Sequence, residues 1–203
     1  RLIAKEEHKE ANLESNQREI LSSVFRSQLP QIKKVEFNVE TQSLGENGAP
    51  IMITQSEYMR RMKEMANIQA GMSFYGEMPN MYNLVLNADH KLVKQVLTDA
   101  GNSCKAALEP IESEMANLNN RRKELQKAQE GKKTEDIPQA EKDELNDIEK
   151  KISDETTKKQ AVLGEYANGN KIIHQLIDLA LLQNNMLKGE ALTNFVKRSI
   201  ELI

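Results

Sequence analysis

The sequence has few aromatic residues and no tryptophan. Phenylalanine and tyrosine make up 4% of its 203 residues, whereas charged residues make up 29%. This balance disfavours a β-sandwich and favours helices with solvated faces. Hydrophobic residues amount to 38% and are locally concentrated, which is sufficient for a core in a chain of this length. We therefore predict an α+β fold that is mostly helical.

The sequence also lacks a cysteine pair, a long apolar run and an excess of one charge. Its single cysteine, Cys104, cannot form an internal disulfide, and we expect a cytoplasmic protein. No stretch approaches the roughly 18 apolar residues of a membrane helix, so we expect no membrane partner. The 28 basic and 31 acidic side chains are interspersed with a net charge of −3, which argues against nucleic acid as a partner. The chain begins with Arg1 inside a charged helical pattern, as expected of an excised fragment.

Catalytic and metal-binding motifs are missing. The glycine spacing of Gly71 and Gly76 is followed by Glu77, where a phosphate-binding loop needs a lysine. No Cys-x-x-Cys, His-Glu-x-x-His or calcium-loop pattern occurs. The histidines His8, His90 and His174 are far apart in sequence, on separate predicted helices. We expect no catalytic residue, cofactor or metal in this chain, and no enzyme activity of its own.

Residues 1–103 have the pattern of an α+β unit with a small sheet. Alternating apolar residues predict strands near 35–39, 51–54 and 82–86, the first two joined as a β-hairpin through a loop containing Asn47-Gly48. Helical spacing predicts helices over 1–28 and 57–69, the second with Ser56 as its N-cap. A further helix should start with Asp89 as its N-cap and end at Gly101-Asn102.

Residues 104–166 change character and predict an antiparallel helical hairpin that projects from the body. Apolar residues keep a heptad-like spacing in two stretches, separated by the polar turn 131–136, and Pro138 is placed to start the second helix. The charge runs at 121–123 and 158–159 are better explained as solvated faces than as binding patches.

Residues 167–203 are the most apolar part of the chain and predict two helices separated by Gly189. Two helices can bury one stripe each against the other, yet the apolar residues of the first helix spread around it. A second copy of the chain is the simplest cover, forming an intermolecular four-helix bundle in a homodimer. The alternative is that this pair packs on the sheet of its own chain. The predicted dimer-interface residues are Ile173, Leu176, Ile177, Leu179, Ala180, Leu182, Leu192, Phe195, Val196 and Ile200.

Seven of the nine methionines lie between Met52 and Met81. A helix that carries Met59, Met62 and Met65 would present a flexible, polarisable surface, flanked by basic residues, that adapts to many apolar partners. The alternative is that these methionines pack on the sheet, which spacing alone favours slightly.

The order of these elements resembles the C-terminal domain of the 90-kDa heat-shock chaperone family. The sequence Asn87-Ala88-Asp89-His90 is similar to the family's Asn-Pro-Asp-His turn, and the terminal helices at 177–182 and 195–198 are similar to its dimerisation helices. The resemblance covers residues 1–103 and 167–203, with 104–166 as an insertion without a family role. It implies an ATP-driven chaperone whose nucleotide site, with ATP and Mg, lies in an N-terminal domain outside this chain.

The resemblance also places part of the client-binding surface on the methionine helix, at positions matching Tyr58, Met62 and Met65, with Met59 as a further candidate. We therefore expect a dimerisation and client-binding domain whose partners are a second copy and unfolded or partly folded client proteins. The alternative is a coiled-coil scaffold or adaptor that acts through the hairpin at 104–166.

Overall fold

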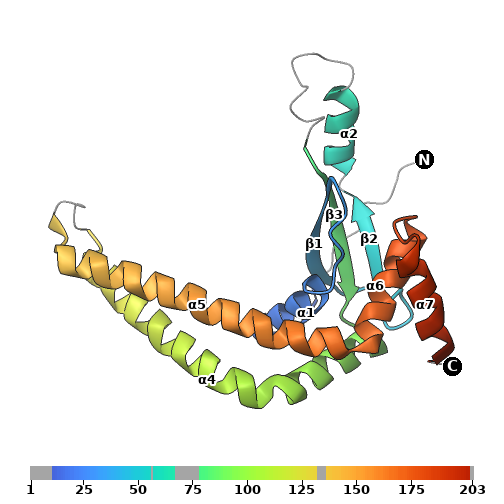
Figure 1. The fold of residues 1–203 in the computed structure, drawn as a ribbon. Coiled ribbons are helices and arrows are strands. Elements are labelled where there is room, and N and C mark those ends of the chain that lie inside the picture. The colour runs from blue at the N-terminus through green and yellow to red at the C-terminus, as the bar shows by residue number, and fades with distance from the viewer. Residues whose placement is uncertain (1–10, 56, 67–77, 132–135, 202–203) are drawn as a thin grey trace.

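The structure is a computed structural model that describes residues 11–55, 57–66, 78–131 and 136–201. A small sheet stands at its centre, a long helical arm projects to one side, and two shorter helices lie on the other side (Figure 1). The predicted mostly helical α+β fold is confirmed. In chain order the elements are α1 (Ser15–Arg26), β1 (Val35–Gln42), β2 (Ile51–Gln55), α2 (Glu57–Ala66), β3 (Asn80–Asn87), α4 (Lys91–Gln129), α5 (Gln139–Gly169), α6 (Lys171–Gln183) and α7 (Glu190–Glu201).

The sheet has the strand order β1-β3-β2, with β1 parallel and β2 antiparallel to β3. All three predicted strands are present, but the predicted hairpin between the first two is wrong, because β3 lies between them. Leu84, Val85 and Leu86 of β3 are all buried. A strand that is apolar on both faces takes the centre of a sheet, and this burial outweighs the local turn signal at Asn47-Gly48.

The loop between β1 and β2 is held across the end of the sheet by the side chains of Asn87, the last residue of β3, and of Asp89, two residues later. Asn87 is fully buried, and its amide oxygen accepts hydrogen bonds from the backbone of Leu44 (3.1 Å) and of Asp89 (3.1 Å). Its amide nitrogen donates to the carbonyl of Gly45 at 2.9 Å. A Cβ atom on Gly48 would lie 2.7 Å from the carbonyl oxygen of Leu44, so this close approach requires glycine.

Helix α1 covers the sheet with one apolar face. Ile20, Leu21, Val24 and Phe25 follow helical spacing and are buried in the main core. The prediction of a helix over 1–28 is wrong for residues 11–14, because the chain there is irregular and α1 starts after Glu14, whose backbone N–H donates to the side chain of Gln17 at 3.0 Å. Residues 1–10 lie outside the described part of the chain.

Helix α4 is far longer than predicted. It continues through Gly101-Asn102 to Gln129, and the expected stop there is wrong. Ala100, Cys104 and Leu108 extend the buried stripe across this point. Their burial outweighs the roughly 1 kcal/mol that a glycine costs inside a helix. The expected unit boundary at 103/104 therefore falls inside α4, and the one at 166/167 falls inside α5.

The start of α4 is capped by His90 and not, as predicted, by Asp89. The Nδ1 atom of His90 accepts a hydrogen bond from the backbone N–H of Leu92 at 3.2 Å. Asp89 instead accepts from the hydroxyl of Ser43 (2.5 Å) and from the backbone N–H of Gly45 (2.8 Å). These bonds lower the pKa of the Asp89 carboxyl. Asn87 and Asp89 together attach the loop between β1 and β2 to the start of α4, which is the root of the arm.

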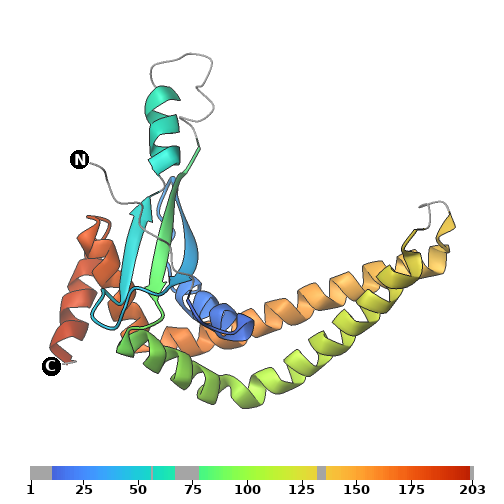
Figure 2. The ribbon, with the colours of Figure 1, turned by 180° about the vertical axis from the view of Figure 1, so that it is seen from behind.

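The arm formed by α4 and α5 is the predicted antiparallel helical hairpin. α4 bends along its length (Figure 2), as expected of a helix with an internal proline, Pro110. Beyond the bend, Leu118, Leu125 and Ile148 form a small apolar cluster that is separate from the main core. Between the two clusters lies Lys159, which is buried although charged.

Lys159 fastens the arm to α1. Its ammonium group lies 2.9 Å from a carboxylate oxygen of Glu19 on α1 and 3.1 Å from one of Glu112 on α4, and it donates to the side chain of Asn16 at 3.1 Å. Lys159 is buried, whereas the side chains of Glu19 and Glu112 are partly exposed. These ion pairs favour one packing arrangement, because moving α1 or α4 away would remove a partner from the buried ammonium group.

Candidate interaction surfaces

The C-terminal helix pair, α6 and α7, divides the predicted interface residues into two groups. Ile173, Leu176, Ile177 and Ala180 of α6 are buried in the core of their own chain. Phe195 of α7 is partly buried against the same core. The alternative of packing on the body of the same chain thus holds for one face of α6. The other predicted residues remain exposed, namely Leu179, Leu182, Leu192, Val196 and Ile200.

Helix α7 contains no buried residue. Val196 is 48% exposed and Ile200 70% exposed. Together with Leu192 they recur every four residues, so they lie on one stripe of the helix. Leu179 and Leu182, three residues apart, are exposed on one side of α6, the helix that α7 contacts.

Polar contacts hold α7 against α6. The side chain of Arg198 pairs with the carboxylate of Asp178, and the amide of Gln175 donates to the hydroxyl of Ser199 at 2.6 Å. Burial raises the pKa of Asp178, although Arg198 opposes this shift. The contacts fix the position of α7 and leave its apolar stripe uncovered.

The methionine helix, α2, extends beyond the end of the sheet (Figure 1). It has no extensive contact with another described element, so the expected alternative of packing on the sheet does not hold for this helix. Tyr58 is 67% exposed and Met65 44%, whereas Met59 and Met62 are half-buried. The predicted N-cap Ser56 and the continuation of this helix past Ala66 lie outside the described residues.

Ion pairs link charged side chains along α2. Arg60 bonds to both Glu57 (2.8 Å) and Glu64, and Arg61 bonds to Glu57 at 2.9 Å. Hydrogen bonds from the two arginines lower the pKa of Glu57 to about 2. Lys63 donates to the side chain of Asn80 at 2.8 Å and ties α2 to the start of β3.

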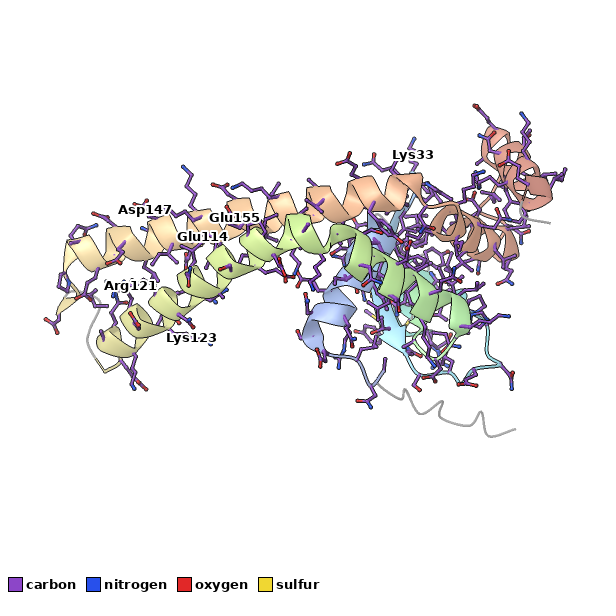
Figure 3. All side chains as sticks on the ribbon, turned by 90° about the horizontal axis from the view of Figure 1, so that it is seen from below. Lys33, Glu114, Arg121, Lys123, Asp147 and Glu155 are labelled. Carbon is purple, nitrogen blue, oxygen red and sulfur yellow. The ribbon has the colours of Figure 1, made fainter. Side chains whose placement is uncertain are left out.

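The arm presents a polar surface. None of the large exposed hydrophobic residues in the described part of the chain belongs to α4 or α5. Figure 3 shows charged side chains, among them Glu114, Lys123 and Asp147, that stand out from both helices. Near the tip, Arg121 of α4 binds Glu144 of α5 through two nitrogens, at 2.7 and 3.1 Å. This is the arrangement of a solvated face, as the charge run at 121–123 predicts. The same prediction for 158–159 is wrong at Lys159, which is buried because Glu19 and Glu112 pair with it at the junction of α1, α4 and α5.

The described residues do not converge on a catalytic or metal site. They contain no group of three or more His, Cys, Asp or Glu side chains placed to hold a metal ion. His90 caps α4, and His174 lies 3.0 Å from the carbonyl oxygen of Asn168, so the two act locally. Cys104 is buried in the core, and burial raises its pKa. Over the residues described, no helix combines the length and the apolar character needed to cross a membrane.

Two side chains that hold separate elements together, Asn87 and Lys159, were not predicted from the sequence. A signal for Asn87 was present, because an amide directly after the apolar run Leu84-Val85-Leu86 marks a polar group at a buried strand end. Lys159 gave no such signal, since it lies in a charged helix among many other lysines. Its partner Glu19 is 140 residues away and is brought close only by the fold.

Known proteins match this chain over its whole length. It is 66% identical to chaperone protein HtpG of Bacteroides fragilis, 63% to that of Bacteroides thetaiotaomicron and 44% to that of Porphyromonas gingivalis. In each case all of this chain is matched, and it spans about 30% of the relative's length. No family model matches the chain, and no solved structure matches it. The relatives confirm the resemblance, and the chain belongs to the HtpG chaperone family as a segment equal to about 30% of these proteins' length.

Proposed function

We propose that this chain is the C-terminal dimerisation and client-binding domain of an ATP-dependent cytoplasmic chaperone that assists protein folding. One observation carries the proposal: the large exposed hydrophobic residues of the described chain occur on α2 and on α6–α7 and nowhere else. Exposed apolar residues that gather on particular elements mark surfaces for other proteins. The HtpG relatives supply the chaperone role.

The α6–α7 surface is proposed to bind a second copy of the chain. An antiparallel helix pair with an uncovered stripe can meet its own copy about a two-fold axis and form a four-helix bundle. The stripe Leu192, Val196 and Ile200 would then be buried together with Leu179 and Leu182. Such an interface places self-complementary apolar surfaces at its centre and the polar contacts of α7 around them.

Substitution of Ile200 tests the dimer. Ile200→Asp should weaken self-association by about a hundredfold or more, because an unpaired charge would be buried in the interface. Asn194→Asp, on the side of α7 away from the stripe, is the matched control and should leave association unchanged. Sedimentation equilibrium at micromolar concentration measures both, and a monomeric wild-type chain would refute the dimer.

The α2 surface is proposed to bind unfolded client segments. Tyr58 and Met65 are the most exposed residues of its apolar stripe, with Met59 and Met62 beside them. Replacement of Tyr58 and Met65 by serine should weaken binding of a permanently unfolded, carboxymethylated protein by about tenfold, from the apolar area lost. Glu64→Gln is the control on the same helix. Fluorescence anisotropy gives the affinity, and an unchanged value would return α2 to a structural role.

The nucleotide chemistry of the whole protein is proposed to lie outside this chain. ATP and Mg would bind in another domain of the parent chaperone, and this segment would respond by changing the distance and orientation of its partner copy. Isothermal titration of the chain with Mg·ATP should give no heat of binding. A saturable signal would require a nucleotide site within these 203 residues and would change the assignment.

A further inference from the structure

The outer edge of β1 is an uncovered strand edge. β1 lies at one side of the sheet and pairs with β3 along its whole length. Its other edge faces the angle between the sheet and the arm, and no helix or strand runs alongside that edge in either view (Figures 1 and 2). A hollow of about 440 Å³ lies at the end of β1, bounded by Arg18 and Ser22 of α1, by residues 39–42 of β1 and by Asn83 of β3.

The hydrogen-bond pattern shows which backbone groups point outward. The carbonyl of Lys34 accepts from the N–H of Asn80 at 2.8 Å, and that of Gln42 accepts from the N–H of Ala88 at 2.9 Å. Backbone groups of successive strand residues point to opposite edges, so even-numbered residues between these two face β3. Phe37, Val39 and Thr41 therefore direct their N–H and C=O groups to the outer edge.

These outward groups have no hydrogen-bond partner among the residues that the structure describes. Val35, at the start of the strand, donates to the carbonyl of Ile32 at 3.0 Å and so closes the edge at that end. The next three outward residues, Phe37, Val39 and Thr41, remain open. A row of alternating donors and acceptors at strand spacing is complementary to one kind of partner, another extended backbone.

Side chains on β1 determine which extended segment fits. Glu36 and Glu40 lie on the same face of the strand. The carboxylate of Glu40 accepts a hydrogen bond from the side-chain amide of Gln42 at 2.9 Å, and the described residues contain no ion-pair partner for either glutamate. Phe37 and Val39 lie on the opposite face, where Phe37 packs against Tyr82 with ring centroids 6.1 Å apart. A strand laid against this edge would meet carboxylates on one face and apolar side chains on the other.

We propose that the outer edge of β1 binds an extended polypeptide segment of another protein as a fourth strand, with preference for alternating basic and apolar residues. Backbone hydrogen bonds to Phe37, Val39 and Thr41 supply the affinity, and Glu36 and Glu40 select basic side chains by cross-strand pairing. This binding mode requires neither the apolar stripe of α2 nor a dimer, so it is separate from the function proposed above.

A pair of N-methylated peptides tests the backbone part of the proposal. The probe is a fluorescent heptapeptide of alternating lysine and valine, with either all lysine or all valine amides methylated. If the lysines face Glu36 and Glu40, an antiparallel added strand uses the valine amides and a parallel one uses the lysine amides. One methylated peptide should therefore lose binding by tenfold or more, while the other binds like the parent. Loss with both, loss with neither, or no binding of the parent would overturn the proposal.

Charge variants test the selectivity. Glu36→Gln and Glu40→Gln should each weaken binding of the lysine peptide by about two- to fivefold, the range of one cross-strand charge pair. The double variant Glu36→Lys, Glu40→Lys should bind a glutamate–valine peptide in preference to the lysine–valine peptide. Binding of that peptide would also show that the variant is folded. Replacement of Tyr58 and Met65 by serine should leave the peptide affinity unchanged. If that α2 variant abolished binding, the peptide would be bound by α2 and the edge would be refuted, whereas the proposed client role of α2 would stand.

Discussion

The arm and the C-terminal pair are both built from two helices that pack against each other, yet they treat their apolar residues differently. In the outer arm, beyond the bend in α4, the few apolar residues are buried between the two helices, as Leu118, Leu125 and Ile148 are. In the C-terminal pair, α6 buries one face in the core of the chain, and α7 buries no residue at all. Among the described residues, the arm therefore leaves no large hydrophobic side chain exposed, whereas the C-terminal pair leaves several exposed.

The two helix pairs differ in how much apolar surface they leave in contact with water. The charged surface of the arm is satisfied by water and by pairs such as Arg121–Glu144, which contribute little stability when exposed. The stripe on α7 remains in contact with water until something covers it. The same helical architecture thus gives a polar surface in the arm and a partly apolar surface in the C-terminal pair.

The largest expected effect compares two neighbouring leucines of α6. Leu181 is buried in the core and Leu182 is exposed. Leu181→Ala should cost about 2–5 kcal/mol of unfolding free energy in the monomer, from lost burial and the cavity left behind. Leu182→Ala should cost less than about 1 kcal/mol there and act on self-association instead. Urea denaturation at low protein concentration measures the monomer, and equal losses for the two variants would contradict the division of α6 into two faces.

A smaller and local effect is expected at the tip of the arm. Leu125→Ala removes a central residue of the small cluster beyond the bend, so it should destabilise the tip by about 2 kcal/mol. Because this cluster is separate from the main core, hydrogen exchange should rise in the outer arm and stay unchanged in the sheet and α1. Faster exchange throughout the chain would show that arm and body unfold as one unit. Leu163→Ala, in the main core, serves as the contrasting variant.

The smallest expected effect is a difference in pH dependence between the root of the arm and the C-terminal pair. The pKa of Asp89 is lowered in the folded chain, so its stabilising bonds to Ser43 and Gly45 are present above its unfolded pKa of about 3.9 and are lost as the pH falls through the folded value. The pKa of Asp178 is raised, so the stability linked to its neutral form is present in acid and is lost as the pH rises through its folded value.

Urea midpoints between about pH 3 and about pH 6 test this contrast. Asp89→Asn should make the free energy of unfolding fall less steeply as the pH is lowered, because it removes a carboxylate whose protonation destabilises the folded chain. Asp178→Asn should make this fall steeper, because it removes a carboxyl group whose protonation stabilises the folded chain. The same change of slope in both variants would contradict the opposite signs.

The elements were largely predictable from local patterns, whereas the pairing of strands and the continuity of helices were not. Strands at Val35–Gln42, Ile51–Gln55 and Asn80–Asn87 follow from alternation, and the break at Gly189 follows from its backbone freedom. The β-hairpin prediction was wrong because a turn signal depends on only a few neighbouring residues. The order of the strands depends instead on which strand buries the most apolar surface. The stop at Gly101 was mispredicted because the burial of Cys104 and Leu108 depends on partners far away in sequence.

The sequence by itself determined that this protein is mostly helical, that its C-terminal helices carry more apolar surface than they can bury against each other, and that its methionines gather near α2. Composition and periodicity suffice for these properties because each property depends only on the types of residue present and on their local spacing. Only the tertiary structure decided which apolar residues of α6 face inward, that α2 extends away from the sheet, and that β1 has an open edge. Those outcomes depend on contacts between residues distant in sequence, such as Lys159 with Glu19, which no local pattern encodes.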